Sequence, residues 1–501
     1  MQKLKLQPAT ITDWLTDNLV TIIFVAFTLF GFMVPNGILI NFFLSDLFDR
    51  FFRNAFLVMS LIIPVMAGLG LNFGIVIGAM AGQIAIVIVR YFGIGGIGGL
   101  LLCALIAVPL ATLFGWLTGM LYNKTRGQEM IASLIVGFFA NGAYQFLLLF
   151  VVGIIIPVSM SNPLIKPDGI GILATVDLIA VGNGGLKYAL DDLWRMPFMQ
   201  AAIVVSLVAL AFVAYRFLRS RNLLSGKPSK KVLAIGLAVG LVLLALSLAV
   251  VFISGVAEAL PLPAIVVMGI FQALLVVSAG AAAILLSWNF RGGKTVVGQP
   301  MKLWKFVVGA VVCVAVIAVA IHSVVTNSAL TLVKQVPVAT GLVIGALALF
   351  TAFIMNTKLG QDFRTAGQNQ HIAKVSGIDV DKTRIIAVIM STVLGAWGHI
   401  IYLQNMGTLS TYTSHSQIGM FSVAALLVGG ASTAKASISN AFIGTLLFNA
   451  MFIMSPEIGT VVFGNALLGE YFRTFMVYGV IGVALGIYVW KAAKKNRVTV
   501  E

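Results

Sequence analysis

The residues of this chain that could act on a solute are mainly amides, and they lie in long apolar runs. Asn72 and Gln83 belong to the glycine-rich stretch GLGLNFGIVIGAMAGQ (68–83). Asn141 and Gln145 are four residues apart in another apolar run, so both would lie on one face of a helix. Amides in a membrane span either hydrogen-bond neighbouring helices or line a polar path. For Asn141 and Gln145 the pattern favours helix contacts, and a solute path along all four residues stays open.

Groups that could carry bond chemistry are few. His399 is the only ionisable candidate deep in an apolar run, and such a residue is more often a helix contact. Cys103 and Cys313 both fall inside apolar runs, where packing is the expected role. The apolar runs contain no Ser-His-Asp or His/Glu metal spacing, and the sequence contains no phosphate-cradling P-loop. We therefore expect that this chain is not an enzyme and binds no metal or cofactor.

The composition defines the elements that would position these side chains. Of 501 residues, 60% are hydrophobic and 10% are charged, with a mean hydropathy of +1.05. Uncharged runs of about 20 residues, the length of a bilayer span, recur throughout. The sequence therefore predicts an all-α, polytopic helical transmembrane bundle embedded in a lipid bilayer. The net charge of +16 does not indicate a nucleic-acid partner, because the basic residues cluster in short loops between apolar runs.

The loop charges predict a topology with both termini cytoplasmic, because Lys3 and Lys5 precede the first run and basic residues follow the last one. Residues 45–53 would form an outer connection. Residues 158–198 would form the largest outer loop and contain a short amphipathic helix over 186–196. The predicted spans are 18–41, two helices within 54–91, 97–121, 129–157, 199–218, 232–253, 264–288, 303–325, 337–356, 384–402, the short segment 419–432, 436–454 and 471–490.

Two apolar segments, 68–83 and 419–432, are glycine-rich and short. One interpretation is that they are interrupted or re-entrant helices, with unwound backbone sheltered inside the protein. Such segments in corresponding halves indicate an inverted repeat with a solute path at its interface. The alternative interpretation is that the glycines of 68–83 allow close packing between helices.

The polar run TKLGQDFRTAGQNQHIAKVSGIDVDKTR (357–384) separates two strongly apolar segments. Between Arg364 and Val375 only Gly367 disfavours a helix, and Gly377 is placed to end one. The run therefore predicts one short helix held between spans at the cytoplasmic face. Its small residues would let another surface approach the backbone closely. A solvated loop with a short helix is the alternative.

The order T-x-x-G-x-x-x-R-x-A-G-x-N-x-x-x-A-x-x-x-G-I resembles the coupling loop of ATP-binding cassette (ABC) importer permeases of the branched-chain amino acid, sugar and nucleoside class. The segment beginning at Glu129, EMIASLIVGFFANG, is similar to the nucleoside branch of that class. The similar parts cover roughly 54–157 and 337–490, whereas 199–325 adds spans that the family does not usually have. The residues that the resemblance places at an ATPase contact are Arg364, Gly367, Asn369, Ala373, Gly377 and Ile378.

The resemblance implies a single transmembrane permease domain over 1–501, with a first half at 18–157 and a second at 337–490. It would lie in a bacterial-type plasma (inner) membrane. Its partners would be ATPase subunits, which hold the ATP and Mg, a second permease subunit, with a heterodimer favoured, and an extracytoplasmic solute-binding protein. The expected solute is a nucleoside or a simple sugar, and a flavin-like molecule remains open.

An ion-coupled secondary transporter is the alternative function. Such carriers generally keep Asp, Glu or His within their spans, whereas the acids of this chain lie in loops or at the ends of runs. The charge distribution therefore favours the permease of an ATP-driven importer, and sodium sites built from backbone oxygens stay open.

Overall fold

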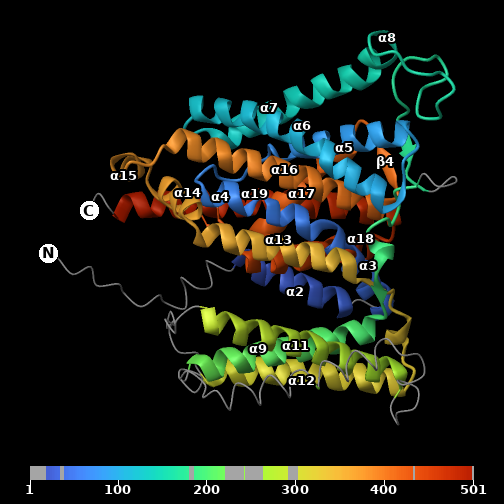
Figure 1. Cartoon of the computed structure of the whole chain (residues 1–501), viewed down its shortest axis with the longest axis vertical. Helices are drawn as coiled ribbons and strands as arrows, with labels where there is room; N and C mark the ends of the chain where they lie inside the picture. The colour runs from blue at the N-terminus through green and yellow to red at the C-terminus, as the bar shows by residue number, and fades with distance from the viewer. Residues whose placement is uncertain are drawn as a thin grey trace. The chain divides into compact units, whose positions relative to one another are not determined.

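A computed structural model of the chain describes residues 19–33, 39–179, 185–220, 242, 263–290, 303–432 and 435–498. The fold is an all-α, polytopic helical bundle, as predicted (Figure 1). Within the described residues, seven helices are long and apolar enough to cross a membrane. The chain divides into two compact units. Unit 1 comprises 1–39, 46–194 and 337–501, and unit 2 comprises 40–45 and 195–336.

The helices of unit 1 come from both ends of the chain (Figure 1). Helix α3 begins within unit 2 and continues into unit 1. The helices are α2 (Leu19–Met33), α3 (Ile40–Ser60), α4 (Ile62–Met66), α5 (Ile75–Tyr91), α6 (Gly96–Lys124), α7 (Glu129–Phe146), α8 (Val152–Ile154), α13 (Val338–Asn356), α14 (Lys358–Gln368), α15 (Gln370–Val375), α16 (Val380–Met406), α17 (Ser414–Val428), α18 (Ile438–Phe463) and α19 (Ala466–Val498).

Unit 2 contains α9 (Phe198–Ser220), α11 (Ala264–Phe290) and α12 (Leu303–Val325). Met199, Ile203, Val266 and Ala320 form its described core. These helices agree with the predicted spans 199–218, 264–288 and 303–325 to within two residues at each end. The predicted span 232–253 lies outside the described residues, apart from residue 242.

Helix α16 is the most buried of the candidate spans of unit 1 and packs against both α5 and α6. The contacts are close because glycines of α5 and α6 lie against its backbone: a Cβ at Gly78 would overlap the Thr392 carbonyl oxygen. Small residues at such crossings let membrane helices approach each other. The other glycines at these contacts are Gly82, Gly115 and Gly119.

The apolar stretch 54–91 contains the predicted break. Helix α3 ends at Ser60, α4 is a single short turn, and irregular backbone runs from 67 to 74 before α5 begins. This backbone is almost entirely buried, so its polar groups need partners inside the protein. Asn72 supplies one, since its Oδ1 accepts hydrogen bonds from the Gly74 amide and the Tyr122 hydroxyl, both at 2.9 Å.

Two predicted connections are wrong. Residues 45–53 are not an outer loop but part of α3, where their charged side chains recur every three or four residues. Residues 186–196 are not an amphipathic helix: Tyr188 has φ 55°, and only the single turn Asp191–Leu193 is helical. Leu186 and Leu190 are buried while Leu193 and Trp194 are exposed, so the four apolar side chains do not share one face.

Helix α17 is the second short apolar helix. Its 15 residues would rise about 22 Å, less than the ~30 Å hydrocarbon core. It ends at Gly429, which packs against the Asn440 backbone of α18 and whose carbonyl oxygen accepts a 2.6 Å hydrogen bond from Asn440 Nδ2. This tight crossing fixes α17 against α18.

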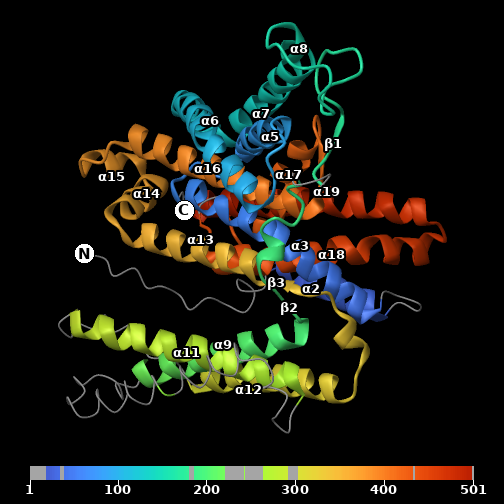
Figure 2. The same cartoon turned by 45° about the vertical axis from the view of Figure 1, so that its right-hand side comes forward.

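The two ends of unit 1 are distinct. Helices α14 and α15 lie at one end, together with the C-terminal part of α19 (Figure 1). Toward the other end, β1 (Thr175–Asp177) pairs antiparallel with β4 (Thr408–Ser410). In the view rotated by 45°, α14 and α15 again lie at the opposite end from β1 (Figure 2). A second pair joins β2 (Arg195–Met196) to β3 (Val336–Pro337).

Candidate functional site

The segment predicted as one short helix folds as two. Helix α14 begins after Thr357, whose hydroxyl accepts from the Gly360 amide, and it ends at Asn369. Asn369 has extended backbone, and its Oδ1 accepts hydrogen bonds from His371 N at 2.9 Å and Ile372 N at 3.1 Å. Asn369 therefore caps a second helix, α15. The prediction of one helix from 364 to 375 is wrong because an Asn side chain satisfies helix-start amides better than it continues a helix.

The end of α15 agrees with the prediction for Gly377. Gly377 has φ 80°, and its amide donates to the Lys374 carbonyl at 3.0 Å. The Ile378 amide donates to the Ala373 carbonyl at 3.0 Å, and Ile378 packs on the buried cluster that contains Ala373. This is the Schellman arrangement, in which a left-handed residue closes a helix and an apolar contact seals it.

The small residues of this segment pack within the chain itself. A Cβ on Gly367 would overlap the Met66 carbonyl oxygen at the end of α4, and Ala373 is fully buried. Arg364, Asn369 and Gly377 are exposed. Helix α15 exposes two apolar side chains beside its exposed His371 and Lys374, since Ile372 is 55% exposed and Val375 is 78% exposed.

An ion pair joins the start of α16 to the first residue of α7. Arg384 is fully buried, and its Nη2 lies 2.5 Å from Glu129 Oε1 and 3.3 Å from the Tyr122 carbonyl oxygen. Beside it, the exposed Arg126 pairs with Asp381. The α6–α7 loop therefore lies at the same end of unit 1 as α14 and α15. The predicted span 129–157 begins at Glu129, as α7 does, and no partner for this residue was predicted.

Three of the four predicted path residues meet around one imidazole, that of His415 at the start of α17. His415 Nδ1 lies 2.8 Å from Gln83 Oε1, and His415 Nε2 lies 2.8 Å from Asn141 Oδ1. Gln145 donates to Asn141 Oδ1 at 3.2 Å. Asn72 lies apart, in the irregular backbone that precedes α5. Sequence reasoning missed His415 because its apolar helix was placed to begin at residue 419.

Both ring nitrogens of His415 face amide oxygens, which sets its hydrogen-bonding options. A neutral imidazole donates from one nitrogen only, so it satisfies one of the two oxygens. An imidazolium, or a turned amide group, would satisfy both. The buried Gln83 Nε2 has no hydrogen-bond partner, and the His415 ring packs edge-on against Tyr144 at 4.9 Å between centroids. The number of hydrogen bonds in this cluster therefore depends on the charge of the His415 ring and on the orientation of the amide groups around it.

His399 occupies a different environment on α16. The residue is fully buried, and neither ring nitrogen has a hydrogen-bond partner. Its ring stacks on Tyr402 with 5.7 Å between centroids. His399 is therefore a helix contact, as the sequence indicated, but one whose polar atoms are unsatisfied.

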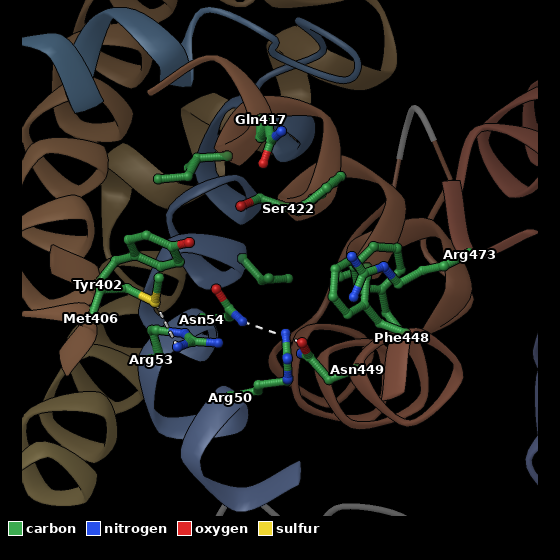
Figure 3. Close-up of a pocket in the computed structure, with 15 residues that line it drawn as sticks. Arg50, Arg53, Asn54, Tyr402, Met406, Gln417, Ser422, Phe448, Asn449 and Arg473 are labelled. Carbon is green, nitrogen blue, oxygen red and sulfur yellow. Dashed lines mark hydrogen bonds between the residues drawn. The ribbon is translucent and has the colours of Figure 1, made fainter. Parts of the chain in front are cut away.

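A cavity of about 270 Å³ opens between α3 and the last four helices of unit 1 (Figure 3). Three arginines line it, together with amides and aromatic rings. None of the four predicted path residues is among the lining. The lining comprises Arg50, Arg53, Asn54, Val58, Tyr402, Met406, Gln417, Ile418, Phe421, Ser422, Ala425, Phe448, Asn449, Phe452 and Arg473.

One signal in the sequence could have indicated this cavity. Asp46, Asp49, Arg50 and Arg53 recur at helical spacing, so they share one face of α3. Arg50 pairs with Asp46 at 2.9 Å. A charged helical face next to a membrane span would have predicted a buried polar site rather than a loop. The partners of this face on α16 to α19 could not be read from local pattern.

Residues 325–485, about a third of the chain, match the family model described as branched-chain amino acid transport system / permease component. The match contains all of α13 to α18 and hence the α14–α15 segment. It supports a permease component of an ABC importer and, with the seven apolar helices, a multi-pass membrane protein. No curated protein and no solved structure matches the chain.

Proposed function

We propose that this chain is the membrane-spanning permease subunit of an ATP-driven importer, and that α14 and α15 form its contact with an ATP-hydrolysing subunit. The bent pair of helices α14 and α15 (358–375), called the α14–α15 elbow, carries the proposal. In this elbow α14 packs closely against the end of α4, and the short helix α15 exposes the apolar side chains of Ile372 and Val375 between two candidate spans. The match of residues 325–485 to an importer permease family supports the same function.

The contacts of the α14–α15 elbow would transmit a displacement of α15 to the membrane helices. Its N-terminal helix is fixed by Gly367 against α4, and its second helix leads directly into α16, the buried centre of unit 1. A load applied to α15 would therefore reach both the broken segment 67–74 and α16. Rigid elements with two arrangements are the physical means by which distant sites are coupled.

The proposed complex has further components that the family resemblance supplies. They are two ATPase subunits that bind ATP and Mg, a second and different permease subunit, and a binding protein outside the membrane. The docking residues are Arg364, Gly367, Asn369, Ala373, Gly377 and Ile378. Since Gly367 and Ala373 are packed inside the chain, we propose that they support the contact and that Arg364, Asn369 and their exposed neighbours make it.

The experiment replaces the exposed apolar pair with carboxylates, Ile372→Glu with Val375→Glu. Burying two unpaired carboxylates in a protein contact costs several kcal/mol, so we expect at least a tenfold loss of coupled ATP hydrolysis, on the order of 1.4 kcal/mol or more. Two quantities are measured for the variant and for the unaltered chain, each purified from its own membrane. They are the rate of ATP hydrolysis and the amount of ATPase subunit that co-purifies.

The matched control is Leu467→Glu, which changes a leucine that is 61% exposed. Leu467 lies in the first turn of α19, where an acidic residue is compatible with the helix dipole. We expect this variant to retain the ATPase. Full ATP hydrolysis and co-purification in the Ile372/Val375 variant would contradict the docking role.

Ion-coupled transport is the second candidate function, and the buried, unpaired His399 is the observation that favours it. An ionisable residue inside a span is a recurrent feature of proton-coupled carriers. If this function held, His399→Gln would abolish uptake driven by a pH gradient in vesicles without ATP. Uptake that requires ATP and persists in His399→Gln would exclude it.

A further inference from the structure

Three arginines line the cavity between α3, α16, α17, α18 and α19. Arg50, Arg53 and Arg473 reach it from α3 and α19 (Figure 3). No Asp or Glu is among the described residues that line it. Asp46 and Glu470, which pair with Arg50 and Arg473, have side chains 43% and 48% exposed and lie outside the lining. The cavity itself therefore offers only cationic, amide, hydroxyl and apolar groups.

Arg53 is the arginine with the least compensation. Its Nη1 lies 3.5 Å from Asn405 Oδ1 and 2.8 Å from the Met406 sulfur, which is a weak acceptor. Its buried Nε has no hydrogen-bond partner. Asn405 also donates to Asp49 at 3.0 Å, so its amide group bridges Arg53 and the Asp49 carboxylate. A partly buried guanidinium with unused donors favours an anion at this position.

Aromatic rings hold all three guanidinium groups in place. Arg50 and Arg473 lie over Phe452 at 4.8 and 4.4 Å from the ring centroid, and Arg53 lies over Tyr402 at 5.4 Å. A guanidinium stacked on a ring keeps its N–H groups in its own plane, free to make paired hydrogen bonds. Carboxylate and phosphate oxygens match this geometry.

The remaining lining defines the rest of the ligand. Asn54 donates to Asn449 Oδ1 at 3.3 Å across the cavity, so an amide pair stands beside the arginines (Figure 3). The apolar wall comprises Val58, Ile418, Phe421 and Phe448. A volume of about 270 Å³ lies just below the range of cavities that hold drug-sized molecules. The ligand would therefore be small, with one anionic end and an apolar body.

We propose that this cavity is where the importer holds its solute, and that the solute is a small organic anion, a carboxylate or phosphate joined to an apolar body. This rests on the proposed function. A neutral nucleoside or free sugar could accept hydrogen bonds from Arg53 but would bring no counter-charge to it. An amino-acid zwitterion would find no carboxylate in the lining for its ammonium group. Tyr402 and Met406 lie in the last turns of α16, whereas α15 precedes its first turn, so the cavity lies toward the face opposite the ATPase contact. That is the face from which a binding protein would deliver the solute.

The test measures binding to the full chain, purified in phosphatidylcholine nanodiscs, by equilibrium dialysis of labelled probes. The anionic probe is 4-methylpentanoate. Its neutral match is 4-methylpentanamide, its zwitterionic match is leucine, and uridine and ribose represent the nucleoside and sugar classes. We expect the anion to bind at least tenfold more tightly than each of the others. Equal or tighter binding of any neutral or zwitterionic probe would overturn the proposal.

Variants assign the binding to the cavity. Arg53→Gln and, separately, Arg473→Gln should each weaken binding of 4-methylpentanoate about tenfold, since each removes a charge-assisted hydrogen bond. Arg473 is 30% exposed, so its variant tests the site even if Arg53→Gln does not fold. Arg53→Lys should restore part of the affinity. The control, Arg126→Gln, alters an exposed arginine at the other end of unit 1 and should bind normally. Unchanged binding in Arg473→Gln and Arg53→Gln would overturn the proposal.

A lipid headgroup carries the same phosphate chemistry, so a separate arm distinguishes the two sources. Phenylglyoxal modifies accessible arginines, and mass spectrometry reads each site. Protection of Arg50 and Arg473 by 4-methylpentanoate in phosphatidylcholine nanodiscs supports a solute site. Protection only when phosphatidylglycerol is added would overturn it in favour of a lipid site. None of these binding measurements needs ATP, so they can succeed or fail independently of the ATPase experiment. If 4-methylpentanoate binds but the Ile372/Val375 variant keeps full coupled ATP hydrolysis, the solute site stands and the proposed docking role is rejected.

Discussion

At the scale of single residues, the buried Arg384 illustrates how this membrane protein treats charge. Its side chain is fully buried with one carboxylate partner, Glu129, whereas Arg126 nearby shares an exposed pair with Asp381. Removing one member of a buried pair leaves an uncompensated charge in low dielectric. The same physics gives the arginines of the cavity their expected preference for an anion.

A prediction at this scale compares the two ion pairs. Glu129→Gln should destabilise the chain by about 3–5 kcal/mol, because Arg384 would stay buried without a counter-charge. Asp381→Asn should cost no more than about 1 kcal/mol, because its pair is solvent-exposed. Chemical unfolding of the purified chain in detergent measures both. Equal effects would show that burial does not govern the strength of these pairs.

At the scale of elements, the contact between α14 and α4 links the proposed docking segment to the broken helix. Gly367 and Gly68 lie backbone to backbone. A Cβ on Gly68 would overlap the Gly367 Cα, and a Cβ on Gly367 would overlap the Met66 carbonyl oxygen. Gly377, in contrast, has open space around its Cα and is required only for its positive φ. Gly367 and Gly377 therefore have different structural roles.

The corresponding prediction separates these roles by hydrogen–deuterium exchange. Gly367→Ala should cost about 1–3 kcal/mol through overpacking and raise exchange in both α14 and residues 62–68. Gly377→Ala should cost about 1–2 kcal/mol through its left-handed backbone and raise exchange only at 373–378. Exchange confined to α14 in Gly367→Ala would show that α4 is not coupled to it.

At the scale of the whole molecule, the chain between 195 and 336 forms most of a second compact unit. The unit 1 residues on either side of this segment lie close together, since the Trp194 carbonyl oxygen accepts from Val338 N at 2.9 Å. Unit 1 alone holds the α14–α15 segment, the His415 cluster and the arginine cavity. The described additional helices α9, α11 and α12 therefore belong to a compact unit other than the one that holds these three features.

This separation predicts that residues 196–335 can be replaced by a short Gly/Ser linker without loss of unit 1. We expect binding of 4-methylpentanoate to persist within about twofold, because linked ends that already lie together add little closure entropy. Increased exchange should be confined to 40–45, since Ser45 Oγ accepts from Lys334 N. Loss of binding in a folded deletion variant would show that unit 2 contributes to the site.

The sequence by itself determined the features that depend on neighbouring residues. The helical spans follow from apolar runs, the break within 68–83 from its glycines, and the end of α15 from Gly377, since each is decided within a few residues of chain. Even here, local rules competed: Asn369 was read as helical, and its capping side chain ended α14 instead.

Only the tertiary structure decided which distant side chains meet. Arg53 and Arg473 come from opposite ends of the chain, and His415 joins Gln83 of α5 to Asn141 of α7. Gly367, which the sequence offered to a partner, is covered by α4. Periodicity shows which face of a helix carries a residue, but the neighbour of that face depends on how helices hundreds of residues apart pack. In this chain that packing is set by close glycine contacts along α16.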